Sequence, residues 1–155
     1  MKVPAHFSSQ KGMTLLEVLI FTTMITLIFL TIASATTQSI KKTIYNQQKI
    51  IATHYAEEAQ EWMRGEKETD WAVFSARSDA TYCLNENIST CDVAGSCWDN
   101  RASCGVSDYS LGGHFKRSSV LTTNGSLIDV TTTVEWIEGQ NRYSVPIHTT
   151  FSRWE

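Results

Sequence analysis

Glycine and proline are absent from a long stretch of this 155-residue chain. Neither residue occurs between Gly12 and Gly65. Both disfavour the helical conformation more than any other residue type. Their absence predicts one continuous helix, which Gly65 ends. Apolar residues spaced mostly by four and seven positions predict the face of its second half that packs on a domain. They are Ile40, Ile44, Ile51, Tyr55, Ala59 and Trp62.

Charged residues are also scarce near the start of the chain. After Glu17 none occurs until Lys41. At ~1.5 Å per residue, the apolar run 13–35 is long enough to cross the hydrocarbon core of a bilayer. A carboxylate inside such a helix costs roughly 2.5–3.5 kcal/mol, so we expect Glu17 to have a specific partner. Hydroxyls in the run can bond back to helix carbonyls and are compatible with a membrane helix. They belong to Thr22, Thr23, Thr26 and Thr31.

The familiar catalytic motifs are missing as well. No Gly-x-Ser-x-Gly, Walker loop or His-Glu-x-x-His occurs, so we expect neither an enzyme nor a bound cofactor. A formal charge of −3 argues against a dominant nucleic-acid surface. The pairs Lys116-Arg117 and Lys41-Lys42 could still contact an anion. Three glutamates most simply form a solvated acidic face rather than a cation site: Glu57, Glu58 and Glu61.

Four cysteines cluster late in the chain, at Cys83, Cys91, Cys97 and Cys104. No Cys-x-x-Cys pair is present, which argues against zinc. Downstream of a membrane-directing segment, two disulfides formed in an oxidising compartment are the simpler interpretation. The spacing leaves all three possible pairings open. We expect Trp98, which falls within this loop, to be exposed.

The end of the chain is typical of an antiparallel sheet. Segments 115–123, 126–137 and 142–153 are separated by Asn124-Gly125, a strong hairpin signal, and by a second polar turn. They predict a three-stranded meander in which Pro146 fits an edge strand. Segment 126–137 alternates with a period of two, which predicts one shared face for Val130, Thr132, Val134 and Trp136. Asp70 could cap a short helix through Arg77, and 81–84 is a brief strand candidate. The predicted fold class is α+β: a long N-terminal helix packed on a small antiparallel sheet.

Residues 11–17, Lys-Gly-Met-Thr-Leu-Leu-Glu, resemble the processing site of type IV prepilins and of the similar pseudopilins of type II secretion. The resemblance implies cleavage between Gly12 and Met13 by a membrane prepilin peptidase, followed by methylation of the new Met13 amine. It also implies that Glu17, the fifth mature residue, pairs with the Met13 amine of a neighbouring subunit. Methionine stands where phenylalanine is usual, and the apolar half lacks the helix-breaking proline of many major pilins.

The resemblance also implies a division of the chain. Residues 1–12 would be the leader, 13–36 the transmembrane and filament-core half of the helix, and 37–65 its amphipathic half. Residues 66–155 would form a globular head that contains the cysteine loop 83–104 and the meander 115–154. Expected partners are other pilin subunits, the prepilin peptidase and methylase, and an inner-membrane assembly platform. The precursor would cross the inner membrane with its N-terminus inside, and the mature chain would join an extracellular filament.

Several functions fit these observations. The leading hypothesis is a structural subunit similar to a minor pilin. One alternative is a pseudopilin of a secretion complex. Another is a pilus-tip module that binds DNA or a surface ligand through loop 83–104, although no sequence motif supports such binding. An ordinary secretory signal cleaved after Ala33-Ser34-Ala35 and an unrelated single-pass anchor are further alternatives. They predict mature N-termini at Thr36 and Met1, against Met13 for a pilin.

Overall fold

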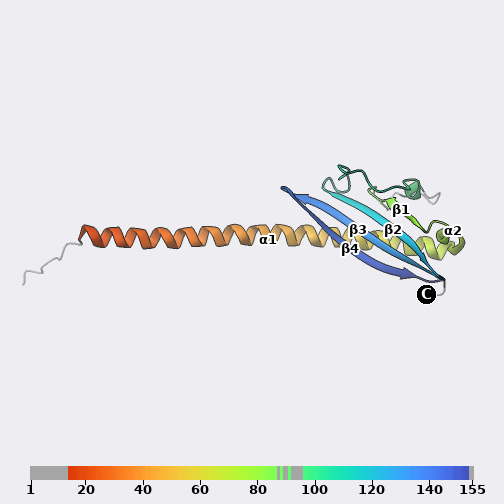
Figure 1. Ribbon diagram of the computed structural model, residues 1–155, viewed down its shortest axis with the longest axis horizontal. Helices are drawn as coiled ribbons and strands as arrows, with labels where there is room; N and C mark the ends of the chain where they lie inside the picture. The colour runs from red at the N-terminus through yellow and green to blue at the C-terminus, as the bar shows by residue number, and fades with distance from the viewer. Residues whose placement is uncertain (1–13, 87, 89–90, 92–95, 154–155) are drawn as a thin grey trace, which may run out of the picture. The chain divides into compact units, whose positions relative to one another are not determined.

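The computed structural model describes residues 14–86, 88, 91 and 96–153 (Figure 1). The predicted processing residues Gly12 and Met13 lie outside the described residues. The chain divides into two compact units, Met1–Ile44 and Tyr45–Glu155. The α+β fold class is confirmed, because a long N-terminal helix is followed by a four-stranded antiparallel sheet.

Helix α1 runs from Leu15 to Thr69, so the uninterrupted helix predicted from the missing glycine and proline is confirmed. In the first unit its threonine hydroxyls donate to backbone carbonyls three or four residues earlier, as expected. Thr22, for example, donates to the carbonyl of Leu19 at 3.0 Å. The threonine hydroxyls of this apolar stretch are therefore satisfied within the helix itself.

In the second unit, α1 packs on the sheet along a line of mostly small residues. The buried residues of this line are Ala52, Ala56, Ala59, Met63 and Lys67. The predicted stripe contains only one of them, Ala59, and it was wrong for Ile40 and Ile44, which are exposed. Alanine lets the helix backbone approach the sheet closely, while the larger Tyr55 and Trp62 flank the contact and are partly buried. Because the prediction followed these larger residues, it placed the contact to one side of the line of residues that is buried.

Helix α1 does not end at Gly65, as predicted, but continues to Thr69. Glycine costs about 1 kcal/mol within a helix, and tertiary contacts of the next turn offset this cost. Glu66 accepts hydrogen bonds from Arg77 and Trp98, and Lys67 is buried with its ammonium 5.8 Å from the centre of the Phe151 ring. Helix α1 ends at Thr69, and Asp70 separates it from the next helix.

The short helix α2, Trp71–Ser75, is capped by Asp70 as predicted. One carboxylate oxygen of Asp70 accepts from the backbone N–H groups of Ala72 and Val73, at 2.9 and 3.1 Å. Strand β1, Ala80–Cys83, follows within one residue of its expected position. A 3-10 turn, η2, at Ser96–Trp98 lies in the cysteine-rich loop.

The sheet has four strands in the order β1-β2-β3-β4, all antiparallel. The three long strands are β2, Phe115–Asn124, β3, Leu127–Glu138, and β4, Asn141–Phe151. The predicted three-stranded meander was incomplete, because β1 pairs with β2 and adds a fourth strand at that edge. Pro146 lies on β4, the opposite edge, where the prediction placed it.

Both hairpins turn through a glycine. Asn124 pairs with Leu127, so the loop is Gly125-Ser126, one residue later than the predicted Asn124-Gly125 turn. Glu138 pairs with Asn141 around Gly139-Gln140 in the same way. Gly125 and Gly139 have φ angles of 65° and 63°, a region that side chains disfavour. Each glycine therefore supplies the positive φ that the first position of its loop takes.

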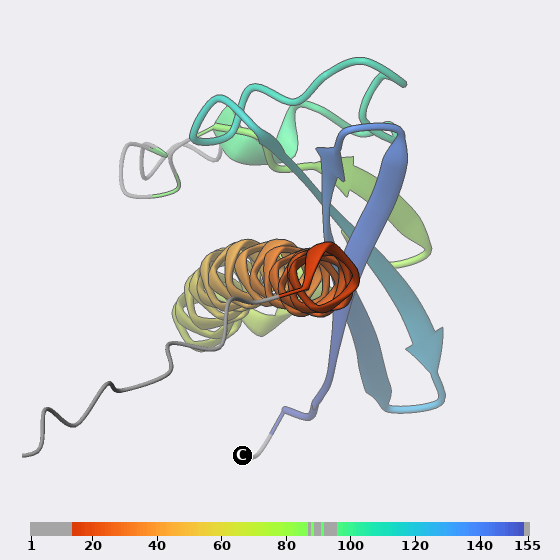
Figure 2. The ribbon, with the colours of Figure 1, turned by 90° about the vertical axis from the view of Figure 1, so that its left-hand side faces the viewer.

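The second part of α1 covers one face of the sheet (Figure 2). Alternate residues of β3 point to this face and are buried, as the period-two pattern predicted: Ile128, Val130, Thr132, Val134 and Trp136. Gln60 of α1 also protects the edge strand, since its side chain donates to the carbonyl of Ile147 at 3.0 Å and accepts from Thr149 at 2.6 Å. The open edge of β4 is thereby partly closed by the helix.

Candidate assembly segment and disulfide loop

The first turn of α1 holds Glu17 in a specific local setting. The N–H of Glu17 lies 3.0 Å from the carbonyl oxygen of Thr14 and 3.4 Å from its hydroxyl oxygen. Thr14 thus stands at the N-cap and Glu17 three residues later, the spacing of a capping box. A carboxylate here is also favoured by the positive end of the helix dipole. Thr14-x-x-Glu17 is visible in the sequence, but its capping role was not predicted from it.

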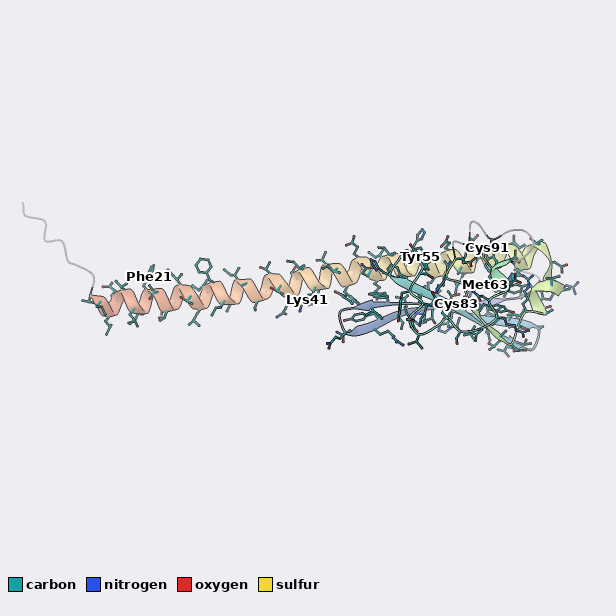
Figure 3. The ribbon with its side chains drawn as sticks, turned by 90° about the horizontal axis from the view of Figure 1, so that it is seen from above. Phe21, Lys41, Tyr55, Met63, Cys83 and Cys91 are labelled. Atoms are coloured by element: carbon teal, nitrogen blue, oxygen red, sulfur yellow. A yellow bond between two sulfur atoms is a disulfide. The ribbon has the colours of Figure 1, made fainter. Side chains whose placement is uncertain are left out.

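Beyond Glu17 the first unit exposes a continuous apolar surface. Every described residue from Thr14 to Ile44 is exposed, and side chains stand clear on all sides of the helix around Phe21 and Lys41 (Figure 3). The large apolar residues of one stretch are Leu15, Leu16, Val18, Leu19, Ile20, Phe21, Met24, Ile25, Leu27, Ile28, Phe29, Leu30 and Ile32. By length and composition, α1 is able to cross a membrane, and it is the one such helix among the described residues. So much exposed apolar surface requires lipid or another protein to cover it.

The four cysteines form two nested disulfides. Cys83 pairs with Cys104 and Cys91 with Cys97, with Cα atoms 4.8 and 5.5 Å apart. Of the three pairings left open by the sequence, this one encloses a short loop inside a longer one. Neither pair offers a thiolate to a metal ion, although the Asp108 carboxylate lies close to the sulfur atoms of Cys83 and Cys104.

Trp98 anchors the disulfide loop, residues 83–104, on α1. The prediction that Trp98 is exposed was wrong. Only 6% of Trp98 is accessible to solvent. Its ring Nε1 donates to Glu66 at 2.9 Å, and its ring centroid lies 4.8 Å from those of Trp62 and Tyr82. The Arg77 guanidinium lies 4.7 Å from the Trp98 ring centre and also pairs with Glu66. The loop is therefore held by an aromatic anchor with a satisfied polar edge.

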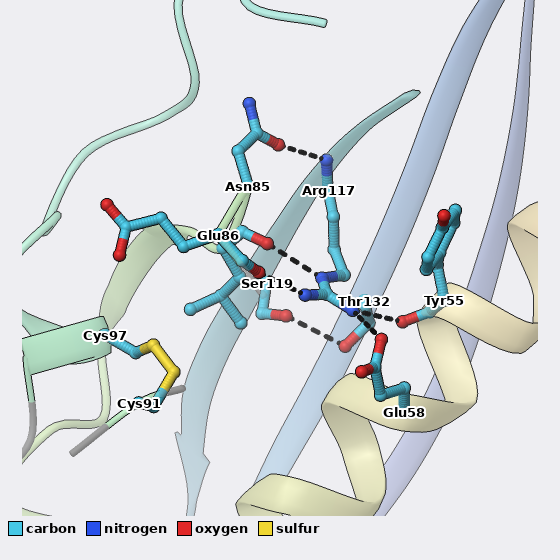
Figure 4. A network of polar contacts seen from close by, with 10 residues as sticks. Tyr55, Glu58, Asn85, Glu86, Cys91, Cys97, Arg117, Ser119 and Thr132 are labelled. Carbon is cyan, nitrogen blue, oxygen red and sulfur yellow. Dashed lines mark hydrogen bonds and ion pairs between the residues drawn. A yellow bond between two sulfur atoms is a disulfide. The ribbon is translucent and has the colours of Figure 1, made fainter. Parts of the chain in front are cut away.

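Arg117 is the second anchor of the disulfide loop, and it is completely buried. Figure 4 shows the polar contacts of its guanidinium. Its Nε and Nη2 donate to the carbonyls of Leu84 and Glu86 at 2.8 and 3.0 Å. Its Nη1 donates to the carbonyl of Tyr55 at 2.7 Å and to the Glu58 carboxylate at 2.9 Å. Burial lowers the pKa of Arg117 from its usual value, and the Glu58 carboxylate opposes this effect. One guanidinium thus joins β2, the start of the loop and α1.

These contacts correct the interpretation of two charged groups. Lys116-Arg117 does not form an anion site, because Arg117 is enclosed and Lys116 lies 3.2 Å from Glu135 as an ion pair without a hydrogen bond. The acidic face is confirmed for Glu57 and Glu61, which are exposed, but not for Glu58. The alternation of β2 carried the missing signal, since Phe115, Arg117 and Ser119 share the face that turns inward.

No protein-family model matches this chain, and neither a characterised protein nor a solved structure matches it. The long apolar N-terminal helix and the small antiparallel sheet are consistent with a pilin-like fold.

Proposed function

We propose that this chain is a structural subunit, similar to a minor pilin, of a type IV pilus filament. The observation that carries the proposal is the exposed apolar part of α1 with Glu17 in its first turn, directly after Lys11-Gly12-Met13. An apolar surface of this extent has no role in a protein that remains in water. A subunit that waits in a membrane and then packs its helix among other helices needs it at both stages.

The proposed assembly step follows from charge. Cleavage after Gly12 would leave a positive α-amine on Met13, one turn before Glu17. In a staggered stack of parallel helices, the Glu17 carboxylate of one subunit meets the Met13 amine of its neighbour. Leaving either charge buried and unpaired is strongly unfavourable, so the pair fixes the register between subunits. Processing and assembly are coupled, because the amine exists only after cleavage.

The remaining partners follow from the same sequence of events. A prepilin peptidase and methylase would process Met13, and an inner-membrane platform would move the subunit from bilayer to filament. The precursor would cross the inner membrane once with its N-terminus inside. The role is structural and requires neither a catalytic residue nor a cofactor.

The two anchors of the disulfide loop favour a scaffold over a tip receptor. Trp98 and Arg117 fasten the loop to α1 through enclosed contacts, and this leaves less of it free to adapt to a ligand. A loop held in this way shapes the surface of the subunit. The scaffold role predicts that disruption of the loop impairs piliation before it impairs binding of any ligand.

Mass spectrometry of the mature N-terminus tests the proposal. Chains recovered from sheared filaments should begin at a methylated Met13. A chain that begins at Thr36 would indicate an ordinary secretory signal, and one that begins at Met1 an unprocessed anchor. Either result would contradict the proposal, as would a correctly processed chain found only with a secretion complex and never in pili.

A further inference from the structure

An open groove of about 640 Å³ lies along the second unit's part of α1, beside the disulfide loop. Trp62 and Ile88 supply its apolar wall, and glutamates stand along its rim. Its lining residues are His54, Glu57, Glu58, Glu61, Trp62 and Ile88. Glu58 is already paired with the buried Arg117, and Glu61 forms an exposed ion pair with Arg64 at 3.1 Å. Glu57 is exposed and has no ion pair with a described residue. The groove is thus an apolar surface with negative charge at its edge.

Residues 40–50 of α1, the basic segment, have the opposite character. Their cations are exposed, and none forms an ion pair with a residue that the structure describes. These cations are Lys41, Lys42 and Lys49. Ile40, Ile44 and Ile50 of the segment are 55%, 41% and 70% exposed. The basic segment therefore presents exposed lysines beside isoleucines that are at least two-fifths exposed, while Tyr45 within it packs on Trp136 and Tyr143.

We infer that the groove of one copy binds the basic segment of a second copy of this chain. The inference rests on the proposed filament function and names one contact within it. Isoleucine side chains would cover Trp62 and Ile88, while lysines would meet the rim at Glu57 and Glu61. Ion pairs that are partly removed from water in this way gain strength over fully exposed ones.

The described part of a single chain does not make this contact with itself. Lys49 and Glu57 lie on the same helix, eight positions apart, and no ion pair joins them. The lysines near the end of an apolar span would also be attracted to anionic lipid headgroups. Lipid accounts for the basic segment alone, since the acidic groove would repel it, whereas a second copy accounts for both surfaces.

Charge exchange between two separately tagged full-length chains tests the inference. One variant carries Lys41→Glu and Lys42→Glu, and the other carries Glu57→Lys and Glu61→Lys. In each, a photo-reactive residue replaces Ile44, and cross-linking between copies is measured in membrane and filament fractions. We expect each variant alone to lose cross-linking roughly five-fold or more. Co-expression of the two variants should restore it between the different tags, because opposite charges then meet again.

A matched control carries Glu68→Lys and Asp99→Lys, which make the same charge change at exposed positions outside the groove. The control should cross-link like the wild type. Cross-linking that neither variant reduces, or that co-expression fails to restore, would overturn the inference, and so would capture of lipid or of another protein at position 44. Failure of the proposed function has a different signature, because the wild type itself would then keep its first twelve residues or be missing from filaments.

Discussion

The two units of this chain use the same helix in opposite ways. In the first unit, large apolar side chains surround α1 and every described residue is exposed. In the second unit, alanines along one face bring α1 close to the sheet, and buried hydrogen bonds fasten the disulfide loop to it. The helical backbone is common to both, so the side chains alone make the difference. The first unit is suited to partners outside the chain, whereas in the second unit one face of α1 is already covered by its own sheet.

Arg117→Met should produce the largest effect on the folding of the second unit. It leaves the Glu58 carboxylate and the carbonyls of Tyr55, Leu84 and Glu86 without their common donor. Removing one partner of a buried ion pair costs about 3–5 kcal/mol in the free energy of unfolding. Urea unfolding of the detergent-solubilised chain, followed by tryptophan fluorescence, measures this. The variant that also carries Glu58→Met should recover part of the loss. A change below about 1 kcal/mol would show that Arg117 is not an anchor.

Trp98→Phe should have an intermediate effect. Phenylalanine retains most of the ring packing against Trp62 and Tyr82 but cannot donate to Glu66. Leaving that carboxylate with fewer donors should reduce the free energy of unfolding by about 1–3 kcal/mol. The same urea titration measures the change. Trp71→Phe is a suitable control, because Trp71 is only partly buried. Equal effects of the two substitutions would argue against a special role for Trp98.

Asp129 should add a smaller, pH-dependent contribution on the outer face of the sheet. Hydrogen bonds from Thr150 and Asn124 lower the pKa of Asp129. A carboxylate with a lowered folded pKa stabilises the fold above its unfolded pKa, about 3.9, and this stabilisation is lost as pH falls through the folded value. Asp129→Asn should therefore reduce the loss of unfolding free energy that occurs as the pH falls below about 4. Identical acid titrations of variant and wild type would contradict the assignment.

Phe21→Ala should have the smallest effect on unfolding and so sharpen the comparison between the units. Its side chain is exposed in the first unit, so its truncation should change the free energy of unfolding of the second unit by less than about 0.5 kcal/mol. Incorporation into filaments should nevertheless fall, because a partner helix loses an aromatic contact. A variant that unfolds more easily but assembles normally would reverse the roles given to the two units.

Local patterns predicted the elements well, whereas contacts between distant residues escaped them. The absence of glycine and proline predicted the long helix, and the alternation with a period of two predicted β3. Asp70 predicted the cap of α2. Gly65 was predicted to end the helix because the low helix propensity of glycine can be read from the sequence alone. The contacts of Glu66 and Lys67 that offset this cost involve residues distant in the chain. Trp98 and Arg117 looked polar or exposed because their hydrogen-bond partners lie 31 to 62 positions away in the chain. The disulfide pairing was open for the same reason.

The amount of Glu17→Val chain in sheared filaments tests the central claim most directly. Glu17→Gln is the matched control, because glutamine retains the hydrogen bonding of a capping box but has no charge. If Glu17 pairs with the amine of a neighbour, both variants should be cleaved before Met13, and both should be incorporated roughly ten-fold less than wild type or worse. Incorporation that valine leaves undiminished, or that glutamine fully restores, would contradict the claim that a charge pair between subunits sets the assembly.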